Sequence, residues 1–280
     1  MKLVLALTAV FMVVEFVGGL VANSLALMAD SAHMLTDVGA LGLSLFVLWF
    51  SRRGASLAKT YGYLRLEILA ALLNGSVLIV LSLLIFWQAW QRMRAPETIS
   101  GPLMLAVAVA GLLVNIIAAL ALHSSAEHNL NLRGAYLHVL GDLLGSVGAI
   151  AAAAIILTTG WLPADALISG FVGLLILLGS WKLVRESVDV LLEAVPKHID
   201  LVAVRRAIDE IPGVDEVHDL HVWTLTSGFF AMSGHAVVRN PENNPRVLRE
   251  INTRMREHFG ISHITVQLEM PTLHHLDSGA

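Results

Sequence analysis

Long stretches of mostly apolar residues fill the first two thirds of the chain, and short polar or turn-forming segments separate them. Each stretch is long enough to cross the hydrocarbon core of a bilayer, which takes roughly 20 apolar residues in a helix. The pattern predicts six transmembrane helices, over residues 3–21, 27–50, 66–90, 103–122, 135–157 and 164–184. The first stretch could be a signal peptide instead, but Glu15 interrupts it and no small-residue cleavage pattern ends it.

The pattern changes after residue 190. Apolar residues recur there at helical spacing in two segments and alternate with polar residues in three others, so we expect two helices and three strands. In chain order the expected elements are a helix over 200–211, strands over 214–225 and 229–238, a helix over 245–259 and a strand over 263–270. The segment Thr226-Ser227-Gly228 suits a hairpin turn between the first two strands.

This αββαβ order is typical of a small α+β domain whose helices cover one face of the sheet, as in ferredoxin-like modules. We therefore predict two domains, an all-α membrane bundle of six helices over residues 1–190 and a ferredoxin-like domain over residues 191–280. The net charge of -4 falls entirely on the second domain, because acidic and basic residues are equally numerous in the first. That charge is consistent with a water-soluble tail.

Composition narrows the classes of protein that this chain can be. Hydrophobic residues make up 56% of the chain and charged residues only 14%, which is far from the usage of a soluble protein. The absence of cysteine excludes disulfides, thiolate metal sites and cysteine nucleophiles. The chain has no excess of positive charge and no basic stripe, so we expect a lipid bilayer and not a nucleic acid as its surroundings.

The distribution of basic residues predicts the orientation in the membrane, because short loops rich in Lys and Arg stay in the cytoplasm. Loops on one side carry most of them, namely Arg52, Arg53, Lys59, Arg65 and Arg133. The other side has Arg92 and Arg94. Both termini, and with them the tail domain, are therefore expected to be cytoplasmic.

Two matching pairs of ionisable residues lie inside the predicted membrane segments. His33 and Asp37 are in the second segment, His138 and Asp142 are in the fifth, and both pairs have the spacing i, i+4. This spacing puts both side chains of a pair on one face of a helix, about 5–6 Å apart. Two such helices face to face can offer two imidazoles and two carboxylates to one point.

These ligands suit Zn²⁺, which binds nitrogen and oxygen atoms in tetrahedral geometry. One Zn²⁺ and two ionised aspartates sum to zero charge, so the loaded site avoids most of the cost of burying a net charge. An empty site cannot keep two bare carboxylates in a low dielectric and should take up protons. The motif therefore predicts proton-coupled transport of zinc, with Zn²⁺ as substrate and H⁺ as the coupling ion.

Several other readings of these residues stay open at this point. Either His-Asp pair alone could be a structural hydrogen bond between helices. Glu15 could relay protons or could equally make a structural contact. A metal sensor or scaffold without transport, a proton-coupled carrier of another cation and a membrane metalloenzyme are the alternative functions. The enzyme has the least support because the chain lacks the motif His-Glu-x-x-His and offers four protein ligands.

The chain resembles the cation diffusion facilitator family, in its zinc-transporter branch. The motifs that carry the resemblance are Ser24 to Asp37 (SLALMADSAHMLTD), Tyr61 to Ala70 (YGYLRLEILA), His123 to Asn131 (HSSAEHNLN) and His138 to Gly145 (HVLGDLLG). The resemblance implies a homodimer in a bacterial inner membrane that exports divalent metal from the cytoplasm in exchange for protons by alternating access. Relatives with Asp at the first position of the site accept Cd²⁺ more readily, so His33 implies a preference for Zn²⁺.

The resemblance also implies a metal site in the tail, formed by His218, His235 and Glu269, although ordinary surface histidines are the alternative. The chain departs from the family in two places. Gln267 replaces a family histidine, which puts a complete two-metal cluster in doubt, and the loop over 52–59 lacks histidines that make an additional site in relatives. His274 and His275 could act as late ligands or could belong to a disordered end, and spacing along a strand separates His263 from Glu269.

Overall fold

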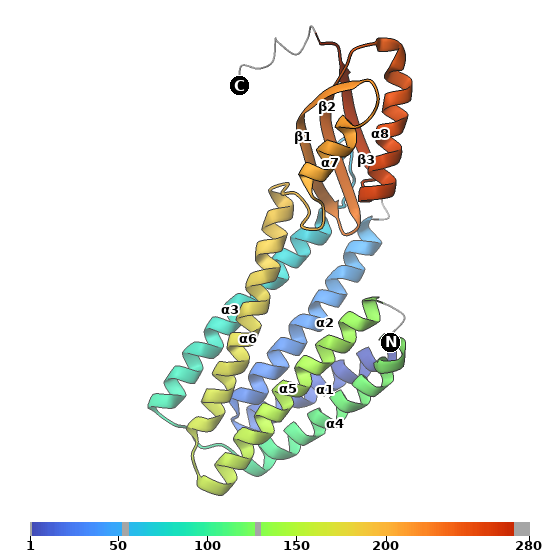
Figure 1. The fold of residues 1–280 in the computed structure, drawn as a ribbon. Coiled ribbons are helices and arrows are strands. Elements are labelled where there is room, and N and C mark those ends of the chain that lie inside the picture. The colour runs from blue at the N-terminus through green and yellow to red at the C-terminus, as the bar shows by residue number, and fades with distance from the viewer. Residues whose placement is uncertain (1, 52–55, 127–129, 272–280) are drawn as a thin grey trace. The chain divides into compact units, whose positions relative to one another are not determined.

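The structure is a computed structural model that describes the backbone of residues 2–51, 56–126 and 130–271. Within these ranges the side chains of residues 2–8, 36–37, 40–49, 51, 121–126 and 130–141 lie outside the description. The elements are, in chain order, α1 (Lys2–Ala22), α2 (Leu25–Ser51), α3 (Leu66–Arg94), α4 (Gly101–Ala126), α5 (Leu130–Thr159), α6 (Pro163–Leu191), α7 (Leu201–Asp209), β1 (Val214–Thr226), β2 (Phe229–Val238), η1 (Pro241–Asn243), α8 (Asn244–Phe259) and β3 (His263–Glu269). Figure 1 shows them along the chain.

The described chain forms two compact units. One consists of Met1–Phe46 and Ala70–Val184, and the other of Val47–Leu69 and Arg185–Ala280. Each unit has its own core, so each is considered separately below.

Each of the six apolar segments expected from the sequence lies within one of the helices α1 to α6. The helices extend past the apolar segments at most ends, because apolar residues mark only the hydrocarbon core while a helix continues into the headgroup region. Among the residues that the structure describes, four helical segments are long and apolar enough to cross a membrane, namely Leu66–Arg94, Gly101–Leu120, Asp142–Thr159 and Pro163–Leu191. A helical membrane domain is therefore confirmed, and the number of six spans stays a prediction.

Small side chains line the seam where α1, α2, α4 and α5 pack together. The buried alanines of this seam are Ala22, Ala26, Ala108, Ala149, Ala152 and Ala153. Small residues let helix backbones approach closely, which is how membrane helices gain packing contacts without a hydrophobic driving force. The seam therefore holds α5 near α2, and these are the two helices that carry the His-Asp motifs.

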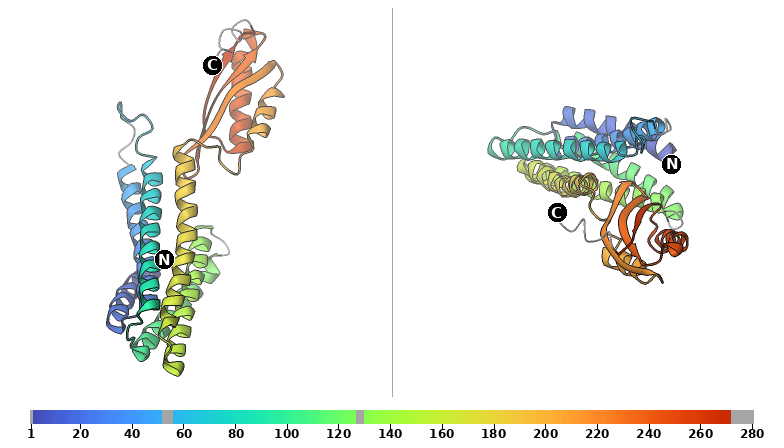
Figure 2. Two further views of the ribbon diagram at one scale, coloured as in Figure 1. Left: turned by 90° about the vertical axis from the view of Figure 1, so that its left-hand side faces the viewer. Right: turned by 90° about the horizontal axis from the view of Figure 1, so that it is seen from above.

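Helices α3 and α6 run alongside each other in Figure 1 and in the left-hand view of Figure 2. Leu78 and Ile85 of α3 pack against Val172 and Ile176 of α6, and Ala29 of α2 joins the same buried cluster. Helix α2 is thus packed on two sides, by the alanine seam on one and by the α3 and α6 pair on the other.

The tail contains a three-stranded sheet of order β1-β2-β3. Strands β1 and β2 are antiparallel and β2 and β3 are parallel, with α8 as the connection between the parallel strands. Gly228 closes the β1 to β2 turn with a φ of 73°, a conformation that glycine adopts without steric cost. The αββαβ order expected from the sequence is present, and each element lies within two residues of the expected bounds.

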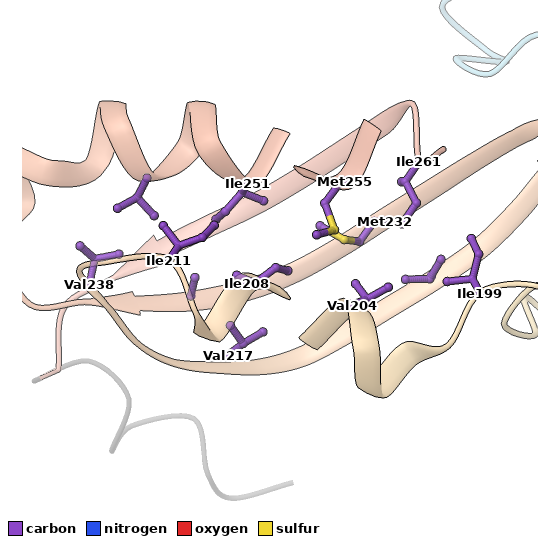
Figure 3. Packing of buried hydrophobic residues seen from close by; sticks show 13 residues of the cluster. Ile199, Val204, Ile208, Ile211, Val217, Met232, Val238, Ile251, Met255 and Ile261 are labelled. Carbon is purple, nitrogen blue, oxygen red and sulfur yellow. The ribbon is translucent and has the colours of Figure 1, made fainter. Parts of the chain in front are cut away.

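The core of the tail lies between the sheet and the two helices (Figure 3). Val247, Ile251 and Met255 recur every fourth residue on α8, so they form one apolar stripe that faces the sheet. Val204 and Ile208 do the same on α7, whose first turn is capped by the Asp200 carboxylate at 2.9 Å from the Val202 amide nitrogen. One face of the sheet is therefore covered by helices, and the other face carries its polar residues.

Candidate metal sites

Helices α2 and α5 bring one histidine and one aspartate of the predicted transport site together. The Nε2 atom of His33 lies 3.9 Å from Oδ1 of Asp142. The Asp142 side chain is only 4% exposed, whereas that of His33 is 27% exposed. A buried carboxylate is tolerated when a cation or proton balances its charge, so this pair has the chemistry of a cation-binding position.

His33 and Asp142 both line a cavity of about 550 Å³ within the membrane unit. The other lining residues are mostly apolar and, apart from Asp30 of α2, come from α3, α5 and α6, for example Leu78, Val147 and Val172. In such a low-dielectric setting the attraction between a divalent cation and a carboxylate is much stronger than in water. The cavity is therefore a place where a small cation could bind through a few polar groups.

Asp30 is a third polar residue of this cavity, and the sequence reasoning did not single it out. It precedes His33 by three residues on α2, so it lies on the same helix face. Its carboxylate approaches Gly145 of α5 so closely that a Cβ at this position would lie 2.8 Å from Oδ1. Only glycine leaves room for this approach between α2 and α5.

The other two members of the predicted site, Asp37 and His138, lie among the residues whose side chains are not described. Their backbones are helical, and each is four residues from a member that is described. The four-residue site of His33, Asp37, His138 and Asp142 therefore stays a prediction. Of its members, the structure describes the side chains of His33 and Asp142, which lie close together.

Glu15 of α1 is a further buried acid of the membrane unit. It is 1% exposed and its side chain lies beside that of Asp30. An acid that is buried in this way near other acids is suited to hold a proton.

The tail brings together the three residues that the resemblance assigned to a cytoplasmic site. One potential ligand atom from each of His218, His235 and Glu269 lies within 4.8 Å of the other two. His218 Nε2 is 3.2 Å from Glu269 Oε2, and His235 Nδ1 is 2.7 Å from Glu269 Oε1. The three residues come from β1, β2 and β3, where His218 pairs with His235, and Val237 pairs with Glu269.

Glu269 is ionised more readily than an ordinary glutamate. Burial on its own would raise the pKa of the carboxyl group, but hydrogen bonds from His235 and His218 outweigh burial and lower the pKa. Gln267 also donates to Glu269 Oε1 at 2.9 Å. The residue that replaces the family histidine therefore supports the carboxylate.

A backbone irregularity places Asp219 beside the tail cluster. The pairing of β1 with β2 shifts between His218 and His221, and Asp219 there has a φ of 49°. Its carboxylate lies 2.8 Å from His221 Nε2 and 3.9 Å from His235 Nε2. Asp219 was not predictable from residue patterns, because a bulge of this kind has no fixed sequence signature. His274, His275, His123 and His128 lie outside the described side chains.

Two family models match the chain. The cation efflux transmembrane domain matches residues 1–192, and the cytoplasmic domain of cation efflux proteins matches residues 196–271. Because the first match covers more than half of the chain, the chain belongs to the cation efflux family, which confirms the resemblance to cation diffusion facilitators. It is an integral membrane protein of a transporter family and not an enzyme.

Individual relatives agree over nearly the whole length. The zinc transporter ZitB of Escherichia coli is 47% identical over 278 residues, which cover 97% of this chain and 88% of ZitB. The metal cation efflux system protein CzcD of Cupriavidus metallidurans is 42% identical, with 99% of this chain and 88% of CzcD covered. The cadmium, cobalt and zinc/H(+)-K(+) antiporter of Bacillus subtilis is 41% identical, with 95% and 86% covered.

Among solved structures, the metal-bound C-terminal domain of the CzcD transporter from Cupriavidus metallidurans is 40% identical to part of this chain. The match covers 25% of this chain and 99% of that domain, with a TM-score of 0.24.

Proposed function

We propose that this protein is a zinc/proton antiporter that exports divalent metal from the cytoplasm by alternating access. The proposal rests on the His33 and Asp142 pair, which lies 3.9 Å apart across α2 and α5 in a cavity between membrane helices. Two relatives support the same conclusion, since one is a zinc transporter and the other a cadmium, cobalt and zinc/H(+)-K(+) antiporter.

In this proposal Asp37 and His138 complete a four-ligand site with His33 and Asp142. The two aspartates neutralise the dication, and the two histidines supply nitrogen ligands. When the metal leaves, the site takes up protons because two bare carboxylates would be too costly at this depth. Asp30 and Glu15 add further carboxylates, and we assign to Glu15 the role of a proton relay.

We further propose that the chain works as a homodimer with both termini in the cytoplasm, with six membrane spans over residues 1–190 and a ferredoxin-like tail over 191–280. The tail cluster of His218, His235 and Glu269 would bind a metal ion. Since an ion bound to three strands favours one arrangement of the tail by mass action, metal binding there could report cytoplasmic zinc to the dimer.

Flux measurements in reconstituted vesicles that contain a zinc dye and a pH dye test the main proposal. Wild-type protein is expected to exchange Zn²⁺ for H⁺, and Asp142→Ala is expected to abolish both signals because it removes an anionic ligand from the buried site. Circular dichroism and size exclusion of the purified variant check that it is folded.

Glu97→Gln is the matched control. It also removes a membrane-unit carboxylate, but Glu97 is 58% exposed and is not among the cavity residues. This variant should transport like the wild type. Retained zinc flux in folded Asp142→Ala would show that the α2 and α5 pair is not the transport site, and zinc binding without any proton movement in the wild type would favour a sensor or scaffold.

A further inference from the structure

A buried carboxylate outside the transport cavity holds the beginning of α2. Asp165, in the first turn of α6, is 0% exposed. Its Oδ1 accepts from the Ser24 hydroxyl at 2.6 Å and from the Ala26 amide at 3.1 Å, and its Oδ2 accepts from the Leu25 amide at 2.7 Å. Both oxygens are thus used by the residues that begin the other helix.

The position of this carboxylate is favourable for two helices at once. The first amide groups of a helix have no partner within the helix and carry a partial positive charge. Asp165 supplies acceptors to the open amides of α2, and it also lies in the first turn of its own helix, α6. Two positive helix ends therefore converge on one carboxylate, and this offsets the cost of burying it.

Arg92 connects Asp165 to the C-terminal ends of two more helices. Its Nη1 lies 3.5 Å from Asp165 Oδ2 and donates to the Asn23 carbonyl oxygen at 2.6 Å, and its Nη2 donates to the Asn23 side chain at 2.8 Å. Arg92 is in the last turn of α3, and Asn23 follows the last residue of α1. The ends of α1 and α3 and the beginnings of α2 and α6 therefore meet in one charged network.

The network leaves little freedom for the α1 to α2 turn. Asn23 has a φ of 54°, which non-glycine residues rarely adopt, and its side chain also donates to Glu97 at 2.9 Å. Leu25, the residue after Ser24, packs with Ala89 of α3 and Ala166 of α6. Polar contacts and packing thus fix both the position of α2 along its axis and its rotation about that axis at the first turn.

His33 lies on this helix, eight residues after Leu25, which is about 12 Å along the helix axis. A rotation or a shift of the first turn of α2 is expected to move His33 with it, because both belong to one continuous helix. Asp142 is on a different helix, so its distance from His33 depends on how α2 is held.

We propose that Asp165 is a positioning residue for the transport site, which sets the placement of His33 relative to Asp142 and thereby the discrimination between Zn²⁺ and larger divalent ions. This inference rests on the proposed function of the α2 and α5 pair. Loss of the network lets the ligands spread, and a wider site binds Zn²⁺ less well while it accepts Cd²⁺ more easily.

The test is Asp165→Asn, which keeps the shape of the side chain but removes the charge and one of the two acceptor oxygens. Zinc and cadmium transport are measured in vesicles that contain equal amounts of folded full-length protein. The apparent zinc affinity is expected to fall about tenfold, the usual size of effects from residues that orient metal ligands. The ratio of cadmium to zinc flux should rise, which a general loss of folded protein would not cause.

Ser24→Ala is the second variant, because it removes one hydroxyl donor and is easier to accommodate if Asp165→Asn does not fold. It should shift the cadmium to zinc ratio in the same direction by a smaller amount. Thr158→Ala on α5 is the control, since it also removes one hydroxyl, but the exposed Thr158 side chain donates to the Ala154 and Ile155 carbonyl oxygens of its own helix. It should leave the ratio unchanged.

An unchanged ratio and an unchanged zinc affinity in folded Asp165→Asn, or in Ser24→Ala where the first variant fails to fold, would overturn the positioning role. The proposed transport site fails by a different result, namely zinc flux that persists in Asp142→Ala. The two failures are therefore distinguishable in the same set of vesicles.

Discussion

His33 is the residue of the site whose chemistry most directly bears on the choice of metal. In the proposed site it would contribute a nitrogen ligand, and Asp142, 3.9 Å away, would contribute an oxygen ligand. Imidazole suits Zn²⁺, whereas geometry and ligand type together decide which divalent ion a site prefers.

We predict that His33→Asp raises cadmium transport relative to zinc transport. Aspartate reaches less far than histidine and so leaves a wider site, which suits the larger ion, and it also removes a nitrogen ligand. The ratio of the two initial fluxes in vesicles is the measurement. His258→Asp, at an exposed position of α8, is the control for adding the same side chain elsewhere, and an equal ratio in both variants would argue against selection by the ligands.

Individual residues of the site were predictable where a pattern was repeated. The His-x-x-x-Asp spacing occurs twice, and this repetition pointed to His33 and Asp142, which the structure places close together. Asp30 was not predictable in the same way, because the corresponding position before His138 is Ala135 and offers no second copy. Asp165 gave no signal either, since an acid in the first turn of a helix is ordinary.

The close approach of α5 to α2 is a property of the two helices as elements. Gly145 allows it, because a side chain there would collide with the Asp30 carboxylate. The alanines of the seam pack α5 against α4 and bring Ala26 of α2 into the same cluster. The separation of the helices that carry the proposed ligands is therefore set by small residues as well as by the ligands.

We predict that Gly145→Ala lowers zinc transport. The added Cβ would lie 2.8 Å from Asp30 Oδ1, so α2 and α5 must separate or Asp30 must move, at a cost of about 1–3 kcal/mol for overpacking. Zinc flux and thermal unfolding of the purified protein are the measurements. Gly170→Ala on α6 is the matched control, since nothing lies within 4 Å of its added Cβ, and it should retain full flux.

Elements were more predictable than their connections. The helical stripe of α8 and the alternation in β1, β2 and β3 are properties of local sequence, and the expected bounds agree with the structure closely. The parallel pairing of β2 with β3 and the positive φ of Asp219 depend on contacts between distant segments and on backbone geometry. Residue patterns along one segment do not contain that information.

At the scale of the whole molecule, the central question is how metal movement and proton movement are linked. Carboxylates are gathered around a cavity with mostly apolar walls, and acids of this kind need either a metal ion or protons as partners. Coupling would then follow from charge balance at one place, with no need for a separate proton channel.

We predict that zinc binding to the transport site releases protons and strengthens as the pH rises. Each proton released makes the apparent affinity increase about tenfold per pH unit, until the ligands are fully deprotonated. Isothermal titration calorimetry of the detergent-solubilised protein, in buffers that differ in ionisation enthalpy, measures the number of protons. His235→Ala serves as background to remove the tail cluster, and a binding heat that does not depend on the buffer would contradict the coupling.

The tail separates its two tasks onto opposite faces of one small sheet. The residues that hold the fold together lie between the sheet and its helices, while His218, His235 and Gln267 occupy the other face. Substitutions on the outer face, such as Gln267→His, can therefore change the proposed metal site without disturbing the interior. A surface of this kind can acquire or lose ligands in single steps during evolution, and it offers protein engineers a place to retune the proposed metal site while the scaffold is kept.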